Sequence, residues 1–73
     1  MKVILEYYDM MRDGKTVNQI LAKKNIHIVK TFPRKNYHRK IKIETTCWNQ
    51  LHSVLAELNS SCENSVNIIK VKS

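Results

Sequence analysis

Length, composition and charge place narrow limits on what this chain can be. Its 73 residues suffice for one domain with one small core, spanning residues 1–73, and leave no room for a nucleotide-binding fold plus a substrate domain. With 42% hydrophobic and 26% charged residues the chain is expected to fold, and its formal net charge of +7 favours an anionic partner.

The first half of the chain predicts a helix between two strands. Residues 2–10 alternate, with Val3, Leu5 and Tyr7 on one side, and predict a strand with two usable faces. Asp13-Gly14 predicts a turn. Residues 16–19, Thr-Val-Asn-Gln, match a capping box, so a helix is expected to begin at Thr16. Residues 26–32 are β-branched and alternate, which indicates a second strand.

The second half predicts a strand, a helix and a final strand. Residues 33–36, Pro-Arg-Lys-Asn, indicate a turn, and residues 37–44 then alternate with their isoleucines facing inward. Thr46 is expected to cap a helix with an apolar stripe. That stripe consists of Trp48, Leu51, Leu55 and Leu58 and is widened by Val54 and Cys47. Residues 66–72, rich in Val and Ile, indicate a fourth strand.

These elements favour an α+β fold with an antiparallel sheet and both helices on one face. The order strand, helix, strand, strand, helix, strand is that of the split βαβ, ferredoxin-like arrangement. If residues 16–24 instead form a strand paired back through Asp13-Gly14, the fold becomes a three-stranded meander followed by one helix and a final strand. Both arrangements leave one face of the sheet open to solvent or to a partner.

Nothing in the sequence predicts a membrane segment or an exported protein. The longest uncharged stretch, residues 45–56, is interrupted by strongly polar side chains, so no membrane span is expected. Glu6 stands where a signal peptide would still be apolar, and we therefore expect a cytoplasmic protein. In that compartment Cys47 and Cys62 should stay reduced.

A one-sided block of positive charge dominates the middle of the chain. Residues 14–43 contain no carboxylate but carry nine of the 13 basic side chains. Such a block repels itself, so a polyanion such as phosphate is expected to compensate it. Arg39 is the exception, because its position in the alternation places it with the inward side chains near the sheet edge, where it is expected to pair with a carboxylate.

Aromatic side chains lie among these charges and could stack on bases, as in single-strand binders. The candidate residues for binding nucleic acid or a partner are therefore Lys23, Lys24, Lys30, Arg34, Lys35, Tyr37, His38, Lys40, Lys42 and Tyr8.

Catalytic and metal sites are not predicted. The histidines and cysteines show no zinc-type spacing, the chain has a single glycine and so no phosphate-cradling loop, and no carboxylate is placed for acid–base work. Asp9 and Asp13 are expected to be solvated. The one catalytic alternative is a metal-free ribonuclease that uses His38 with Lys40, which a domain of this size seldom has a site deep enough to support. No cofactor is expected, and the chain is interpreted as a binding protein and not an enzyme.

The sequence supports two functional hypotheses. The favoured one is a small basic regulatory protein that binds RNA or another single-stranded nucleic acid through a cationic β-hairpin over residues 26–44. The alternative is an inhibitor or antitoxin-like protein that binds and neutralises a nuclease toxin or another enzyme, including through RNA that the enzyme holds. Scarce Gly and Pro with abundant Asn, Lys and Ile are typical of accessory proteins from AT-rich genomes, for instance those of bacteriophages.

Overall fold

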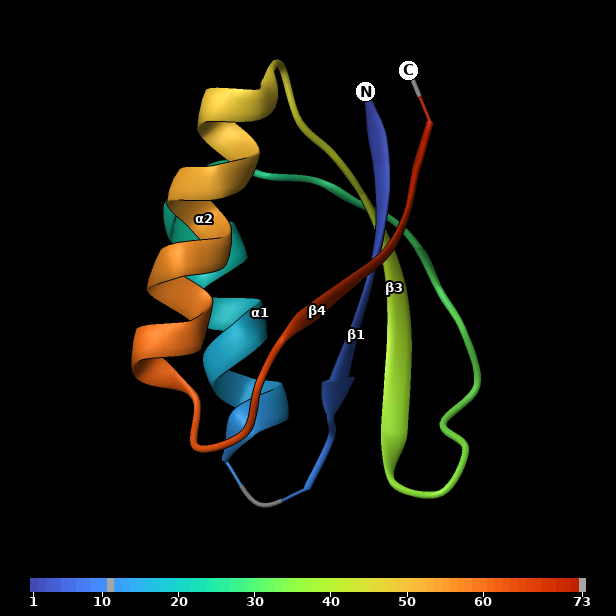
Figure 1. The fold of residues 1–73 in the computed structure, drawn as a ribbon. Coiled ribbons are helices and arrows are strands. Elements are labelled where there is room, and N and C mark those ends of the chain that lie inside the picture. The colour runs from blue at the N-terminus through green and yellow to red at the C-terminus, as the bar shows by residue number, and fades with distance from the viewer. Residues whose placement is uncertain (11, 73) are drawn as a thin grey trace.

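Strands and helices follow one another in the predicted order in a computed structural model that describes residues 1–10 and 12–72. The elements are β1 (Lys2–Tyr8), α1 (Asp13–Lys23), β2 (Ile28–Thr31), β3 (His38–Glu44), α2 (Trp48–Ser61) and β4 (Asn67–Lys72). The four strands form one antiparallel sheet in the order β2-β3-β1-β4, and both helices cover the same face of it (Figure 1). The α+β class is confirmed, and the meander alternative is wrong because residues 13–23 are helical.

The core lies between the sheet and the two helices. Along β1 the side chains of Val3, Leu5 and Tyr7 are buried, and the pairing register sets Val3 opposite Ile43 and Leu5 opposite Ile41 of β3. Both helices contribute to the same cluster of buried side chains, α1 through Val17, Ile20 and Leu21 and α2 through Leu51, Val54 and Leu58. The alternation predicted for residues 2–10 and 37–44 therefore holds over β1 and β3, where it separates buried from outward side chains.

The apolar stripe of α2 is centred differently from the prediction. Leu51, Val54 and Leu58 are fully buried, whereas Trp48 is 55% exposed and Leu55 is only partly buried. At about 100° per residue, Trp48 lies about 90° from the centre of the buried stripe. Its ring instead packs edge-on against His52, with 5.9 Å between the ring centroids. The predicted packing of Trp48 against the sheet is wrong.

Helix α1 begins three residues before the predicted cap. Asp13 and Gly14 form its first turn and Thr16 lies inside it, so the predicted turn at Asp13-Gly14 and the capping box at Thr16 are both wrong. The expectation that Asp13 is solvated is wrong, because its side chain is buried and accepts hydrogen bonds from the backbone amides of Glu63 (2.9 Å) and Asn64 (3.0 Å) in the loop after α2. Burial raises the pKa of Asp13, but these hydrogen bonds outweigh burial and the pKa is lowered overall.

The C-terminal end of α1 and the N-terminal end of α2 are capped in ways that the sequence did not predict. Asn25 adopts a left-handed conformation (φ 57°) after α1, and the amides of Asn25 and Ile26 donate to the carbonyls of Ala22 and Leu21 in a Schellman motif. At the start of α2 the N-cap residue is Cys47, so Thr46 is not the cap. The amide of Thr46 donates to the side chain of Gln50 at 2.7 Å.

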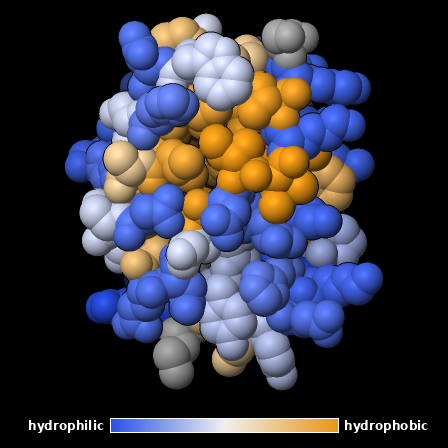
Figure 2. Space-filling view, viewed as in Figure 1, coloured by the Kyte–Doolittle hydropathy of each residue, from blue (hydrophilic) through white to orange (hydrophobic). Residues whose placement is uncertain are grey.

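Strand β4 is one edge of the sheet and runs past α2. Figure 2 shows apolar surface gathered on the side of the molecule seen in this view. Leu55, Ile68 and Val71 are partly buried and pack against the core. Lys70 and Lys72 flank Val71 along β4, and charged side chains at this spacing disfavour pairing of the edge with another strand. No helix among the described residues is long and apolar enough to cross a membrane.

Side-chain truncation in α2 tests how this helix faces the sheet. Leu58→Ala should lower the free energy of unfolding by about 2–5 kcal/mol, because it leaves a cavity in a small core. Trp48→Ala should lower it by less than about 1 kcal/mol, because the ring is largely solvated. Urea unfolding followed by circular dichroism measures both. Equal losses for the two variants would mean that α2 turns another face to the sheet.

Candidate functional site

The face of the sheet opposite the helices carries most of the unpaired charge. The sheet register sets Ile4 beside Lys42 and Lys70, Glu6 beside Lys40, and Tyr8 beside His38. Outward side chains on one strand repeat at about 6.5–7 Å and neighbouring strands lie about 4.8 Å apart, so these groups form a grid. We call this surface the open face. Its outward residues on β1, β3 and β4 are Lys2, Ile4, Glu6, Tyr8, His38, Lys40, Lys42, Glu44, Asn67, Lys70 and Lys72.

Four lysines surround a small hollow on the open face, which we call the lysine hollow. It has a volume of about 70 Å³ and is lined by Lys2, Lys42, Lys70, Lys72 and the side chain of Ile4. The lysines come from three neighbouring strands, β1, β3 and β4. None of the four forms an ion pair within the described part of the chain. Glu44 lies opposite Lys2 in the sheet register, but it forms no ion pair with these lysines among the described residues. The four ammonium groups therefore repel one another, so an anion bound among them would be stabilising.

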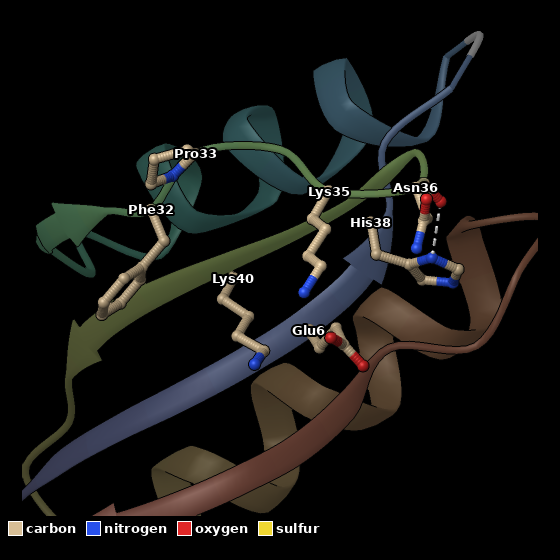
Figure 3. Close-up of a pocket in the computed structure, with 7 residues that line it drawn as sticks. All are labelled: Glu6, Phe32, Pro33, Lys35, Asn36, His38 and Lys40. Carbon is tan, nitrogen blue, oxygen red and sulfur yellow. Dashed lines mark hydrogen bonds between the residues drawn. The ribbon is translucent and has the colours of Figure 1, made fainter.

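A larger hollow lies between β1, β3 and the segment that joins β2 to β3. This hairpin pocket has a volume of about 330 Å³. It is lined by Glu6, Phe32, Pro33, Lys35, Asn36, His38 and Lys40. Figure 3 shows the ammonium groups of Lys35 and Lys40 and the carboxylate of Glu6 turned toward the same space. The pocket therefore combines cations, one carboxylate and ring surfaces.

Three rings cluster at the end of the open face beside this pocket. Tyr8 packs edge-on against Tyr37, with 6.4 Å between the ring centroids, and against His38 at 5.3 Å. Tyr37 is 57% exposed. The ring of His38 also contacts the carbonyl of Asn36 through Nδ1 at 2.9 Å (Figure 3). Because a carbonyl only accepts, this hydrogen bond requires Nδ1–H as the donor and leaves Nε2 facing outward for other partners.

The hairpin turn that presents Tyr37 differs from the predicted one. The backbones of Lys35 and His38 exchange hydrogen bonds of 2.8 and 2.9 Å, so the central residues are Asn36 and Tyr37 and not those of the predicted turn over 33–36. Both have positive φ angles, 51° and 64°, as in the type I′ turns that match the twist of a hairpin. Tyrosine is disfavoured in this conformation, where glycine is the usual residue. The backbone at Tyr37 is therefore strained, and the turn leaves its large ring exposed.

The predicted candidates divide into two groups. Tyr8, Lys40, Lys42, His38, Lys35 and Tyr37 lie on the open face or at its hairpin end. Lys30 lies over the ring of Phe32, with Nζ 4.8 Å from the centroid, and Arg34 donates to the carbonyl of Asp9 at 3.2 Å. These eight residues are brought together by the fold.

Lys23 and Lys24 lie elsewhere. They stand at the C-terminal end of α1 and pair with Glu57 of α2, at 3.4 and 3.1 Å. The hydrogen bond from Lys24 is the main cause that lowers the pKa of Glu57. Glu57 therefore balances part of the basic block from within the chain, and these two lysines belong to the helical layer, which faces away from the open face.

Arg39 has the structural role that its inward position predicted. Its Nε lies 3.0 Å from Oδ2 of Asp9, and its Nη1 donates to the carbonyl of Phe32 at 3.0 Å. The expectation that Asp9 is solvated is wrong, because its side chain is only 19% exposed. Asp9 also occupies the space above Gly14, where a Cβ atom would collide with its carboxylate. A residue larger than glycine at position 14 would displace this ion pair.

Three lysines of the open face were missed because they lie outside residues 14–43. Lys2 stands on β1, and Lys70 and Lys72 stand on β4. The two-residue spacing of Lys70 and Lys72 in a predicted strand was the available signal. It did not reveal that β4 pairs with β1, which is what brings these lysines beside Lys42.

The remaining reactive groups do not form a second site. Among residues 1–10 and 12–72, no three His, Cys, Asp or Glu side chains lie close enough to hold a metal ion. Hydrogen bonds from the backbone of Gln50 and the hydroxyl of Thr46 lower the pKa of the exposed Cys47 thiol, while burial raises the pKa of Cys62.

Comparison of the chain with known protein families, with curated proteins and with solved structures gave no match.

Proposed function

We propose that this protein is a small regulatory protein that binds RNA or another single-stranded nucleic acid on its open face. One observation carries the proposal: lysines from three strands share a single sheet face with the exposed ring cluster of Tyr8, Tyr37 and His38. Lysine ammonium groups neutralise backbone phosphates, and exposed rings stack on bases. We infer binding and no catalytic step.

The geometry favours a single strand over a duplex. Stacking on a side-chain ring requires a base that is free of its own stack, as bases in single strands are. The lysine hollow and the ring cluster lie at different positions along β1, near Ile4 and at Tyr8 respectively. A nucleic-acid strand that runs along β1 would therefore place its phosphates at the lysine hollow and its bases at the ring cluster.

The salt dependence of binding tests the electrostatic half of the proposal. The affinity for a single-stranded RNA should fall as salt rises, with a slope of about −0.7 in log–log form for each phosphate contacted. The double variant Lys42→Ala and Lys70→Ala should flatten that slope by about 1 to 1.5 units, because two ammonium groups of the lysine hollow are lost. Fluorescence anisotropy across a series of salt concentrations measures it.

A matched double variant controls for the change in net charge. Lys23→Ala and Lys24→Ala remove the same two charges from the helical layer, where both lysines pair with Glu57. This variant should keep the wild-type slope to within about half a unit. Equal flattening by both double variants would show that only net charge matters. An absence of RNA or single-stranded DNA binding at low salt would instead favour the protein-inhibitor hypothesis.

Replacement of Tyr37 by glycine separates stacking from stability. Glycine relieves the positive φ at this position, and the lost ring contact with Tyr8 is modest, so the free energy of unfolding should change by less than about 1 kcal/mol. The affinity for single-stranded RNA should fall about tenfold with the salt slope retained, because base stacking is worth about 1–3 kcal/mol. Unfolding and anisotropy measurements on Tyr37→Gly check both. An unchanged affinity would show that the ring does not touch the ligand.

A further inference from the structure

Glu6 is an unexpected residue on a surface that attracts phosphate. It is half-buried on the central strand β1, where it pairs with Lys40 of β3 and with Asn67 of β4. It is the one carboxylate among the residues that line the hairpin pocket. Among the described residues no hydrogen bond to the Glu6 side chain is found, and no cation lies within 4.0 Å of it. A carboxylate here repels a phosphate backbone, so it favours a ligand that brings N–H donors to this point.

We propose that the hairpin pocket binds a single guanine base of the nucleic acid and that Glu6 selects it; this inference rests on the proposed function. Guanine presents two adjacent donors, the ring N1–H and the exocyclic N2 amine, which match the two oxygens of a carboxylate. Adenine and cytosine present one amine beside a bare ring nitrogen. Uracil presents one N–H between two carbonyl oxygens, and the carboxylate repels these oxygens.

The surroundings of Glu6 provide the other contacts that such a base needs. The volume of about 330 Å³ is within the range of small-ligand sites. His38 offers a ring that is held in place by its edge contact with Tyr8 and by its hydrogen bond to Asn36. A ring fixed in this way is a stacking platform that loses little conformational freedom on binding. Lys35 and Lys40, which point into the same space (Figure 3), are positioned to contact the phosphates beside the base.

Base substitution in the RNA tests the inference with the unaltered protein. The probes are single-stranded RNAs of eight uridines in which one central residue is replaced by guanosine, inosine or adenosine. Anisotropy should show the guanosine RNA bound about tenfold more tightly than the adenosine RNA, since a bidentate contact discriminates to this extent. Inosine, which keeps N1–H but lacks the N2 amine, should lie between them. Equal affinity for the guanosine and adenosine RNAs would overturn the inference while leaving the proposed function intact.

Two isosteric variants separate base selection from charge. Glu6→Gln should reduce the guanosine-to-adenosine ratio to near one, while binding of the all-uridine RNA tightens because a negative charge is removed. Glu44→Gln removes the same charge from the open face at a position outside the hairpin pocket, so it should tighten binding and keep the ratio. A ratio retained in Glu6→Gln would overturn the role of Glu6. Failure of all the RNAs to bind at low salt would overturn the proposed function together with the inference.

Discussion

The alternation of side chains along β1 is the constraint on which the rest of this structure depends. Strand β1 lies between β3 and β4, and the burial of Val3 and Leu5 sets its regular register with β3, while its pairing with β4 shifts between Ile4 and Leu5. A slip of one residue would move the whole apolar set to solvent. The same register aligns the outward lysines of three strands around Ile4. The cationic surface is therefore a geometric consequence of forming the core, and substitutions that disturb the core register would disperse the lysines as well.

The partly buried ion pair between Arg39 and Asp9 connects the hairpin segment to the end of β1. Arg39 contacts both Asp9 and the carbonyl of Phe32, and the backbone amide of Asp9 donates to the carbonyl of Tyr37 at 2.7 Å. Gly14 supplies the space that the Asp9 carboxylate occupies at the start of α1. The segment that forms the hairpin pocket and presents Tyr37 is thus fixed to the end of β1. Such preorganisation reduces the conformational entropy that binding would otherwise cost.

Local sequence patterns predicted the helices and strands. Most of the features that these patterns did not predict depend on contacts between segments that are far apart in the chain. Strands β1 and β3 followed from strict alternation, and α2 from its helical period. The start of α1 depends on amides of the loop after α2 that bind Asp13, about 50 residues away, which no local capping signal contains. The exposure of Trp48 depends on how α2 is rotated against the sheet. Lys70 lies near Lys42 only because β1 pairs with both β3 and β4. The turn at Tyr37 has a backbone conformation that tyrosine disfavours.

If a single strand of nucleic acid lies on the open face, as proposed, isoleucine methyl groups report it directly. Ile4 forms the floor of the lysine hollow, whereas Ile20 and Ile26 lie in the core on the helical side of the sheet. In protein labelled at isoleucine δ1 methyl groups, titration with a single-stranded RNA should shift the Ile4 signal and leave those of Ile20 and Ile26 in place. Shifts confined to Ile20 and Ile26, or an unchanged Ile4 signal in a complex that has formed, would contradict the claim.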